Sequence, residues 1–544
     1  MNVKQFLSYI RYTLFPIIVY GIAIGLATGT IIWAYSLTVE FISEQSANIY
    51  AFFRANPVYV PLLFLSLATL AVISYFIILL APEVTGSGVP YSEGVMRGLL
   101  PLRWLIVLPA MILNSFISFI AGIPLGSEGP SILIGSCIGS GSNDIAIKGN
   151  RTRLAWKRQS ITGGASAAFA VAFNAPLAGI IFALEEIHKR FSPMILLPAS
   201  ASVIVASITA NVLTALTGHG ISEVIFTEFN MLAEPTFREL PFLALLGLMM
   251  GLFSVLFSLL YNTVATGMNK TKIPAWLKIL AVFLLTGIAG LFVADSIGSG
   301  GNVIRKIALM QLEWQPLLLL LCIKLILVVF CSNGGVTGGL FFPTLAIGAI
   351  FGGLTAKLFI AMGMNDDFYN MIVLISMCAF LGGVMRSPIT AVVLIIEMTN
   401  TLTNDFWATC LVILLAYFIV ELFNVEPIYD KLLGTILGKR NAGKKKKLVE
   451  YEIEIEENSF AVGRSVRDIL WPANALVIKV KETDSQGNII YRMDKDGERK
   501  IHVGDKFVIQ AETSDPNEIY KQLCYIVKRP EFFNASPEFD GKND

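Results

Sequence analysis

The sequence predicts an all-α polytopic membrane protein, built from two inverted repeats of broken and tilted helices and followed by a small α+β cytoplasmic domain. Of its 544 residues, 55% are hydrophobic and 15% are charged, whereas a soluble domain has about 45–50% apolar residues. Glycine-rich motifs recur about 212 positions apart. Beyond the run Lys444–Lys447 the composition changes to the alternating pattern of soluble strands.

Apolar segments fill the predicted membrane domain, residues 1–438, and many of them are interrupted by Gly or Pro. A straight span needs about 20 residues, so hydropathy alone does not fix the number of spans. The first segment follows Lys4 and Arg11 and has no clear small-residue cleavage site, so we expect a retained span. The segments run roughly over 15–36, 58–80, 102–122, 161–185, 194–216, 238–262, 278–294, 315–331, 340–362, 370–397 and 407–424.

Basic residues gather in two segments, Lys148–Arg158 and Lys439–Lys447. Such segments face the cytoplasm by the positive-inside rule. We therefore expect both termini on the cytoplasmic side of the inner or plasma membrane. The formal net charge is only +1, so the charge balance does not indicate a nucleic-acid partner.

An internal repeat relates two halves of the membrane domain, about 15–218 and 235–430. Four landmarks recur in one register, and broken helices in both halves are typical of transporters whose site lies at the repeat interface. The pairs are Gly86-Ser87-Gly88 with Gly298-Ser299-Gly300, Pro130 with Pro343, Pro176 with Pro388, and Glu185 with Glu397.

Glu128 is a lone carboxylate in a Gly/Pro-rich break, Gly126–Pro130, between two apolar segments. A charged side chain at membrane depth costs at least ~2.5 kcal/mol and usually marks an ion pathway. An interrupted backbone is tolerated there only where it lines a cavity enclosed by protein. The second repeat reads Gly339-Leu-Phe-Phe-Pro343 and has no acid. Glu128 is therefore the leading functional residue.

Four motifs closely resemble the anion-pathway signatures of the CLC chloride channel and chloride/proton antiporter family. They occur in the family's order, and the resemblance covers residues 15–435. It implies a homodimer whose subunits each have their own pore, formed by two inverted halves. The motifs are Gly86-Ser87-Gly88-Val89-Pro90, Gly126-Ser127-Glu128-Gly129-Pro130, Gly338–Pro343 and Tyr429.

The resemblance implies that Ser87 and Tyr429 coordinate a central chloride, with the backbone amides of Leu340 and Phe341 beside it. Gly126 and Gly129 belong to the same binding set. Half-helix starts suit this task, since their free N–H groups and positive dipole ends attract an anion without a full charge. Outside this context, Ser87 would be a helix cap and Tyr429 an aromatic residue at the membrane interface.

The resemblance also makes Glu128 the gate and outer proton acceptor. Its carboxylate occupies the anion site as a tethered anion, or swings away when protonated or displaced by chloride. Glu186 corresponds to the internal proton-transfer glutamate of the antiporters, and Glu93 to another acid near the internal proton route. We expect Glu185, like its repeat mate Glu397, to be structural. Without the family, the acidic pair 185–186 would be a surface salt-bridge patch.

Antiport is favoured over an uncoupled voltage- or pH-gated chloride channel, because the family's channels usually lack an acid at the position of Glu186. A fluoride or nitrate exchanger is a further alternative, but Ser87 favours chloride, since the residue there tracks anion preference in the family. Many relatives carry Arg or Lys where this chain has Ser127. The absence of that cation should weaken the local attraction for external anions without removing the gate.

After a basic linker, 439–448, residues 449–530 resemble the C-terminal regulatory subdomain of RCK type (TrkA-C-like). This implies a ligand-sensing or dimerising domain, with a small nucleotide as a candidate ligand; the alternative is a folded tail that only stabilises the dimer. The segment differs from paired CBS modules, so no adenine-nucleotide site of that kind is expected. We expect residues 531–544 to be disordered.

Other function classes lack their motifs. A potassium-selective pore would need a carbonyl filter such as Thr-Val-Gly-Tyr-Gly, which does not occur. We find no zinc-protease, hydrolase or phosphate-loop motif, only three His, and six Cys without short-spaced pairs. We therefore predict no enzyme activity, no metal and no cofactor, with chloride bound only as substrate.

Overall fold

The computed structural model describes residues 15–146, 156–219, 226, 229, 235–399, 406–441, 447–456, 459–472, 475–483, 489–492, 497–513 and 515–527. Some predicted features lie outside these residues: the basic residues Lys148, Arg151 and Arg153, most of the run Lys444–Lys447, and the tail 531–544. The sequence Ser485-Gln-Gly-Asn488, which is typical of a hairpin turn, also lies outside them. Among the described residues, eight helices are long and apolar enough to cross a membrane. The prediction of a polytopic membrane protein is therefore confirmed.

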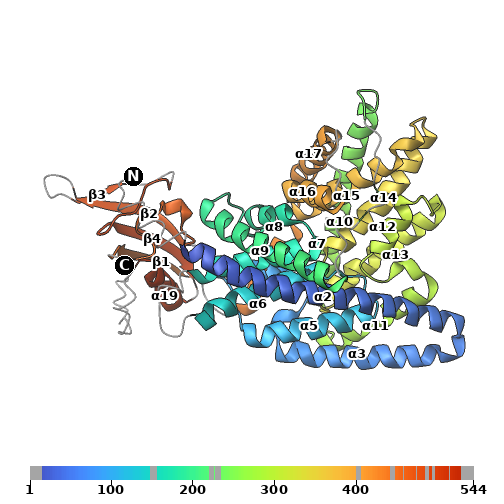
Figure 1. Ribbon diagram of the computed structural model, residues 1–544, viewed down its shortest axis with the longest axis horizontal. Helices are drawn as coiled ribbons and strands as arrows, with labels where there is room; N and C mark the ends of the chain where they lie inside the picture. The colour runs from blue at the N-terminus through green and yellow to red at the C-terminus, as the bar shows by residue number, and fades with distance from the viewer. Residues whose placement is uncertain are drawn as a thin grey trace.

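The first repeat contains helices of very unequal length, and its helices α2, α3 and α5 run side by side (Figure 1). Its elements are α2 (Phe15–Ala55), α3 (Val60–Leu80), α4 (Val89–Met96), α5 (Trp104–Ile120), α6 (Glu128–Ala146), α7 (Lys157–Phe173), α8 (Pro176–Phe182) with a π-helical turn (Ala183–Ile187), and α9 (Pro193–Thr217).

The second repeat has the same succession of long and short helices. Its elements are α10 (Leu240–Lys270), α11 (Ala275–Phe292), α12 (Gly301–Ala308), α13 (Trp314–Asn333), α14 (Phe341–Ala361), α15 (Tyr369–Met385), α16 (Pro388–Thr399), α17 (Phe406–Leu422) and α18 (Ile428–Arg440).

Hydropathy misplaced some of these helices. The apolar segments 161–185 and 370–397 are each two helices, and α2 continues to Ala55, well beyond residue 36. The largest omission is α6, which is rich in Gly and Ser. A Cβ added at its Gly135 would lie 2.2 Å from the carbonyl oxygen of Gly164 on α7. Small residues therefore replace apolar ones where these two helices cross in close contact.

The repeat is visible in the backbone and in its caps. Asn174 after α7 and Arg386 after α15 both have left-handed φ values, 48° and 62°. The carboxylate of Glu397 accepts hydrogen bonds from the first N–H groups of α8, and that of Glu185 accepts hydrogen bonds from those of α16, at 2.6–3.0 Å. Each half therefore caps a helix of the other, which confirms the two-repeat fold.

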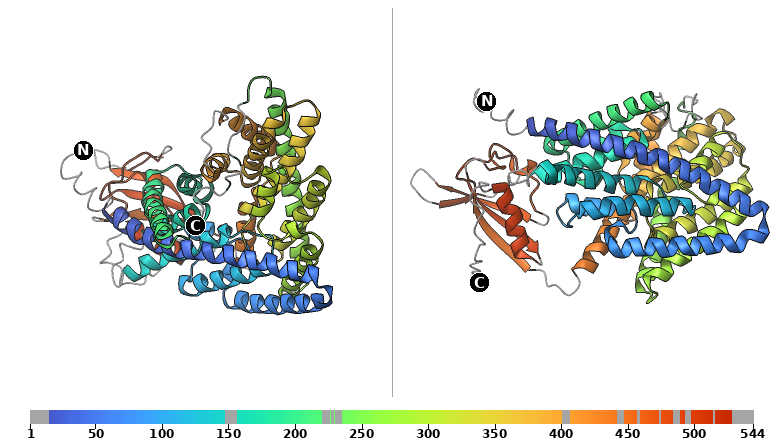
Figure 2. Two further views of the ribbon diagram at one scale, coloured as in Figure 1. Left: turned by 45° about the vertical axis from the view of Figure 1, so that its right-hand side comes forward. Right: turned by 60° about the horizontal axis from the view of Figure 1, so that its bottom comes forward.

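The C-terminal segment forms a small α+β unit, as predicted. Four strands, β1 (Lys447–Glu454), β2 (Ala475–Thr483), β3 (Ile489–Arg492) and β4 (Lys506–Thr513), form an antiparallel sheet in the order β1-β4-β2-β3. Helix α19 (Pro516–Val527) packs on it. The alternating pattern in β1 buries Tyr451 and Ile453 in the unit's core. Figure 2 shows the sheet at the end of the molecule where α2 begins.

Candidate ion-pathway site

Three glycine-rich loops meet inside the membrane domain and are tied together by backbone hydrogen bonds. Gly86 donates to the carbonyl of Val336 at 3.2 Å and accepts from Gly338 at 3.2 Å. Gly126 and Gly339 exchange both of their hydrogen bonds, at 2.8 and 2.6 Å. These contacts join the first repeat to the second at the helix starts.

Gly129 shows how closely the loops approach each other. A Cβ at this position would lie 1.9 Å from the carbonyl oxygen of Ser87 and 2.9 Å from the Cα of Gly339. No side chain fits there without moving backbone. Gly129 is therefore required because the three loops converge here. From the sequence, we predicted this glycine only as part of the anion-binding set.

Helices α4, α6 and α14 all begin at this point of convergence. The first N–H groups of a helix have no partner within it, and its dipole places partial positive charge there. Leu340 and Phe341, which we predicted beside the anion, are the N-cap and first residue of α14. The arrangement is suited to holding an anion without a full positive charge.

Two buried hydroxyl groups lie at the same place. Ser87, just before α4, is 6% exposed and Tyr429, on α18, is 1% exposed. Their hydroxyls face each other, yet neither makes a hydrogen bond of normal geometry. Since an unpaired buried hydroxyl is costly, these donors are suited to a ligand, and an anion fits their chemistry.

The carboxylate of Glu128 is folded back toward the helix starts. Glu128 is 1% exposed and is the first residue of α6. A Cβ at Gly126 would lie 2.1 Å from its Oε2, and one at Gly339 2.8 Å from the same atom. The backbone N–H groups of Glu128, Phe342 and Ser127 lie near the carboxylate, although its Oε2 makes no hydrogen bond of normal geometry. The side chain therefore takes the position in which those N–H groups would hold a free anion.

Aromatic rings pack beside this site. The ring of Phe341 lies 6.0 Å from that of Tyr429 and 5.5–5.9 Å from those of Phe169, Phe173 and Phe182. Phe182 ends α8, and the π-helical turn that carries Glu186 follows directly. The cluster is an apolar layer next to the segment that carries the second predicted acid.

Glu93 and Glu186 are both buried, at 1% and 3% exposure. Glu93 lies on α4 and pairs with Arg97 at 2.8 Å. Arg97 also donates to the carbonyl of Ile187, at 3.2 Å, which is the residue after Glu186. The structure thus brings the two predicted internal acids to neighbouring segments.

Asp430 belongs to the same group of charged side chains as Glu93 and Arg97. We did not identify it as a site residue from the sequence. It pairs with Lys189 and lies 3.8 Å from Arg97. Two signals could have indicated the cluster: Arg97 follows Glu93 by four residues on a helix, and Asp430 follows Tyr429 directly. The partners themselves come from segments far apart in the sequence.

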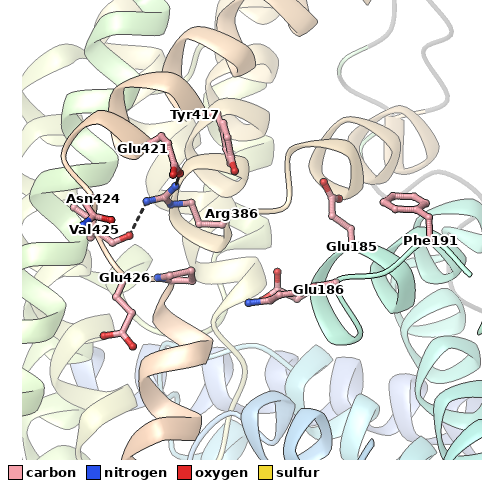
Figure 3. A pocket seen from close by; sticks show the side chains of 11 residues that line it. Glu185, Glu186, Phe191, Arg386, Tyr417, Glu421, Asn424, Val425 and Glu426 are labelled. Atoms are coloured by element: carbon pink, nitrogen blue, oxygen red, sulfur yellow. Dashed lines mark hydrogen bonds and ion pairs between the residues drawn. The ribbon is translucent and has the colours of Figure 1, made fainter. Parts of the chain in front are cut away.

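Glu186 also lines an open cavity of about 650 Å³. Figure 3 shows Glu185 and Glu186 on one side of the cavity. On the other side, Arg386 forms an ion pair with Glu421 and donates a hydrogen bond to the carbonyl of Val425. Both walls carry charges of both signs, so the cavity is suited to water and protons. Its lining residues are Glu185, Glu186, Lys189, Phe191, Arg386, Tyr417, Glu421, Asn424, Val425, Glu426 and Pro427.

A buried polar pair, Asn114 and Thr337, supports the loops and was also missed. The Asn114 side-chain amide donates to the Thr337 hydroxyl at 2.6 Å, and that hydroxyl donates to the carbonyl of Val84 at 2.7 Å. Both side chains are fully buried. The pair holds the segment before α14 against the segment before α4. Nothing in the sequence marks it, since the two residues are 223 positions apart.

Comparison with known proteins agrees with this geometry. A family model described as voltage gated chloride channel matches residues 69–421. The chain belongs to the CLC family. Within the part of this CLC protein that the structure describes, no group of three or more His, Cys, Asp or Glu side chains could hold a metal ion.

Relatives of this CLC chain include proteins named as transporters. The H(+)/Cl(-) exchange transporter ClcA of Vibrio cholerae (strain M66-2) is 31% identical over 453 residues, which cover 80% of this chain and 92% of the relative. A solved structure of a slow cyanobacterial Cl-/H+ antiporter has a TM-score of 0.70 at 28% identity, covering 78% and 99% of the two chains. A eukaryotic CLC transporter shares the fold, with a TM-score of 0.64 at 20% identity over 89% and 87%.

Proposed function

We propose that this CLC protein exchanges chloride for protons across the membrane. The observation that carries the proposal is the seat of the Glu128 carboxylate, which lies against the helix starts where an anion would bind. The relatives named as chloride/proton exchangers support the same reaction. The buried acid Glu186 beside an open cavity supplies the second proton station that exchange needs and conduction does not.

The proposed mechanism couples the two ions through one site. Chloride binds between the hydroxyls of Ser87 and Tyr429 and the first N–H groups of α14. A carboxylate and a chloride compete for the same N–H groups, so chloride displaces Glu128 when it enters. The displaced side chain takes up a proton, because burial favours the neutral acid once the N–H groups no longer stabilise its charge.

Protons reach the other side of the membrane through Glu186. In this proposal, water molecules carry the proton from Glu128 past the aromatic layer around Phe341 to Glu186 and the open cavity. Glu93 lies beside this route and its ion pair with Arg97 holds the end of α4 against the π-helical turn. In this proposal, Glu93 positions the inner acid, Glu186.

Several finer features are part of the same proposal. We place the protein in the plasma membrane as a homodimer with both termini in the cytoplasm, as the family resemblance and the basic segments suggest. All proposed site residues come from one chain, which supports one pathway per subunit. The C-terminal unit is proposed to be a regulator of RCK type, with a small nucleotide as its candidate ligand.

The decisive experiment uses purified protein in liposomes. A chloride gradient should drive protons uphill, detected as a pH change inside the vesicles that a proton ionophore collapses. Chloride flux that never moves protons against their gradient would instead identify an uncoupled channel. Fluoride and nitrate, tested in the same assay, check the prediction from Ser87 that chloride is the preferred anion.

Two variants assign the proton stations. Glu128→Gln should mimic the protonated gate, abolishing proton movement while chloride still passes. Glu186→Gln should likewise keep chloride flux and lose protons. Glu44→Gln, an exposed acid on α2, is the control and should transport like wild type. Proton coupling that survives Glu128→Gln would refute the assignment of the gate.

A further inference from the structure

Arg158 connects the C-terminal unit to helix α4. Its Nε donates to the carbonyl of Met96 at 2.6 Å, and its Nη1 donates to the carbonyls of Leu470 and Trp471 at 2.8 and 2.9 Å. Met96 is the last residue of α4, so its carbonyl has no partner within the helix. One guanidinium group therefore caps α4 and holds a loop of the C-terminal unit.

The position of Arg158 makes these contacts more than an incidental cap. Arg158 is the second residue of α7, where the helix dipole disfavours a cation. The three carbonyl dipoles offset this effect. Lysine could not replace the arginine here, because only a planar guanidinium presents donors in fixed directions to separate acceptors.

Helix α4 links Arg158 to the ion-pathway site. It has only eight residues, so its two ends lie ~12 Å apart. Ser87 precedes its first turn, and every residue from Val89 to Met96 except Tyr91 is buried. A Cβ at Gly94 would lie 2.8 Å from Leu433 on α18, the helix that carries Tyr429. A short, tightly packed helix moves as a rigid body, so a shift at Met96 reaches Ser87.

The C-terminal unit has further contacts at the same place. The ring of Phe460 packs edge-on against Trp156, with centroids 5.2 Å apart, and Ser192 donates to Asp468 at 3.1 Å. The turn after α4 also touches α19, because a Cβ at Gly98 would lie 3.6 Å from the side chains of both Arg158 and Gln522. The unit is therefore seated directly on the end of α4.

We propose that Arg158 is a positioning residue. The packing of the C-terminal unit on the membrane domain, which we call its seat, sets the position of α4 through Arg158 and thereby sets the chloride affinity at Ser87. The inference rests on the proposed function, because the proposed function assigns chloride to the site at Ser87. It makes the C-terminal unit part of the transport machinery, independently of any ligand that the unit binds.

The test is chloride binding to the full-length protein in detergent, measured by isothermal titration. Arg158→Lys should weaken chloride binding about tenfold, equivalent to ~1.4 kcal/mol. Trp156→Ala and Phe460→Ala loosen the seat of the C-terminal unit without touching α4, and each should weaken chloride binding about threefold, or ~0.7 kcal/mol. Lys157→Gln is the matched control: the neighbouring residue pairs with Asp144, and its removal should leave the chloride Kd unchanged.

The titration separates a positioning role from a purely structural one. A purely structural residue would lower yield or melting temperature while the folded fraction binds chloride with the wild-type Kd. Wild-type Kd values in all three variants would overturn the proposal. An effect of Arg158→Lys alone would also overturn it, since the seat of the unit would then be irrelevant. If Arg158→Lys does not fold, Trp156→Ala and Phe460→Ala decide the question.

Wild-type protein, measured first, distinguishes the two proposals. If it neither binds chloride nor couples protons, the proposed function is wrong. If it does both and the variants bind chloride as tightly, only the role of Arg158 is wrong.

Discussion

At the scale of single residues, the site depends on glycines that leave room for one carboxylate. Gly126 and Gly339 flank the Oε2 atom of Glu128, and a Cβ at either position would displace it. At Gly126 the obstacle is the end of a flexible side chain, whereas at Gly339 the backbone nitrogen of Gly129 lies closer still, at 2.7 Å. Enlarging Gly126 therefore acts on the gate more than on the backbone.

Gly126→Ala should move the Glu128 carboxylate from its seat, because the new Cβ would lie 2.1 Å from Oε2. We expect chloride flux to persist while the number of protons moved per chloride is at least halved. Parallel chloride and proton flux measurements in liposomes give this ratio. Gly434→Ala on α18 is the control, since a Cβ there meets nothing within 4 Å. An unchanged ratio for Gly126→Ala would contradict the seat of the gate.

The Asn114–Thr337 pair yields a second residue-scale prediction. Thr337→Val keeps the shape of the side chain but removes its hydroxyl, leaving the Asn114 amide and the Val84 carbonyl unpaired in a buried place. An unpaired buried group costs about 1–3 kcal/mol, so thermal unfolding should occur at a lower temperature. Chloride binding should weaken as well, because the loops before α4 and α14 separate.

A double-mutant cycle supplies the control for this pair. Asn114→Ala and Thr337→Val together should cost less than the sum of the two single changes, since they share one hydrogen bond. Additive losses of stability would show that the bond contributes nothing measurable.

At the scale of helices, the reciprocal caps hold the two repeats together. Glu185 and Glu397 each accept hydrogen bonds from the first turn of a helix in the other half. A carboxylate at a helix start satisfies free N–H groups and matches the helix dipole. The structure agrees with a structural role for Glu185, directly beside the proposed proton station Glu186.

Glu185→Gln and Glu397→Gln should therefore have similar effects. Each should lower the free energy of unfolding by about 0.5–2 kcal/mol, as loss of a charged cap does. Thermal unfolding in detergent measures the change. Proton coupling should survive in both variants, in contrast to Glu186→Gln. A loss of coupling in Glu185→Gln alone would show that Glu185 carries protons.

At the scale of the whole molecule, one chain supplies every proposed site residue. Ser87, Glu93, Glu128 and Glu186 come from the first repeat, whereas Phe341 and Tyr429 come from the second. The loops of both repeats are hydrogen-bonded to each other within the chain. In the proposed homodimer, each subunit should therefore work by itself.

A covalently linked tandem dimer tests this independence. If one copy carries Glu128→Gln and the other is wild type, proton flux should fall to about half that of the wild-type tandem, as expected for two separate pathways related by two-fold symmetry. Loss of nearly all proton flux would show that the subunits share one pathway. A tandem with Glu44→Gln in one copy is the control.

The membrane class, the repeat and the signature residues could be predicted from the sequence, because composition and spacing are properties of the chain alone. The 212-residue spacing of Pro176 and Pro388 corresponds in the structure to paired helices with reciprocal caps. By contrast, α6 escaped a hydropathy reading, since small residues that pack closely carry little apolar signal.

Only the tertiary structure decided the contacts between segments that are distant in the sequence. The carboxylate of Glu128 reaches its seat only because the loop at Gly339 lies beside Gly126. Asn114 meets Thr337 across 223 residues, and Arg158 meets Leu470 across 312. Sequence spacing specifies which face of one helix a residue occupies, but partners on separate elements are chosen by how those elements pack. The sequence thus indicated the candidate site residues, and the packing determined what holds them in place.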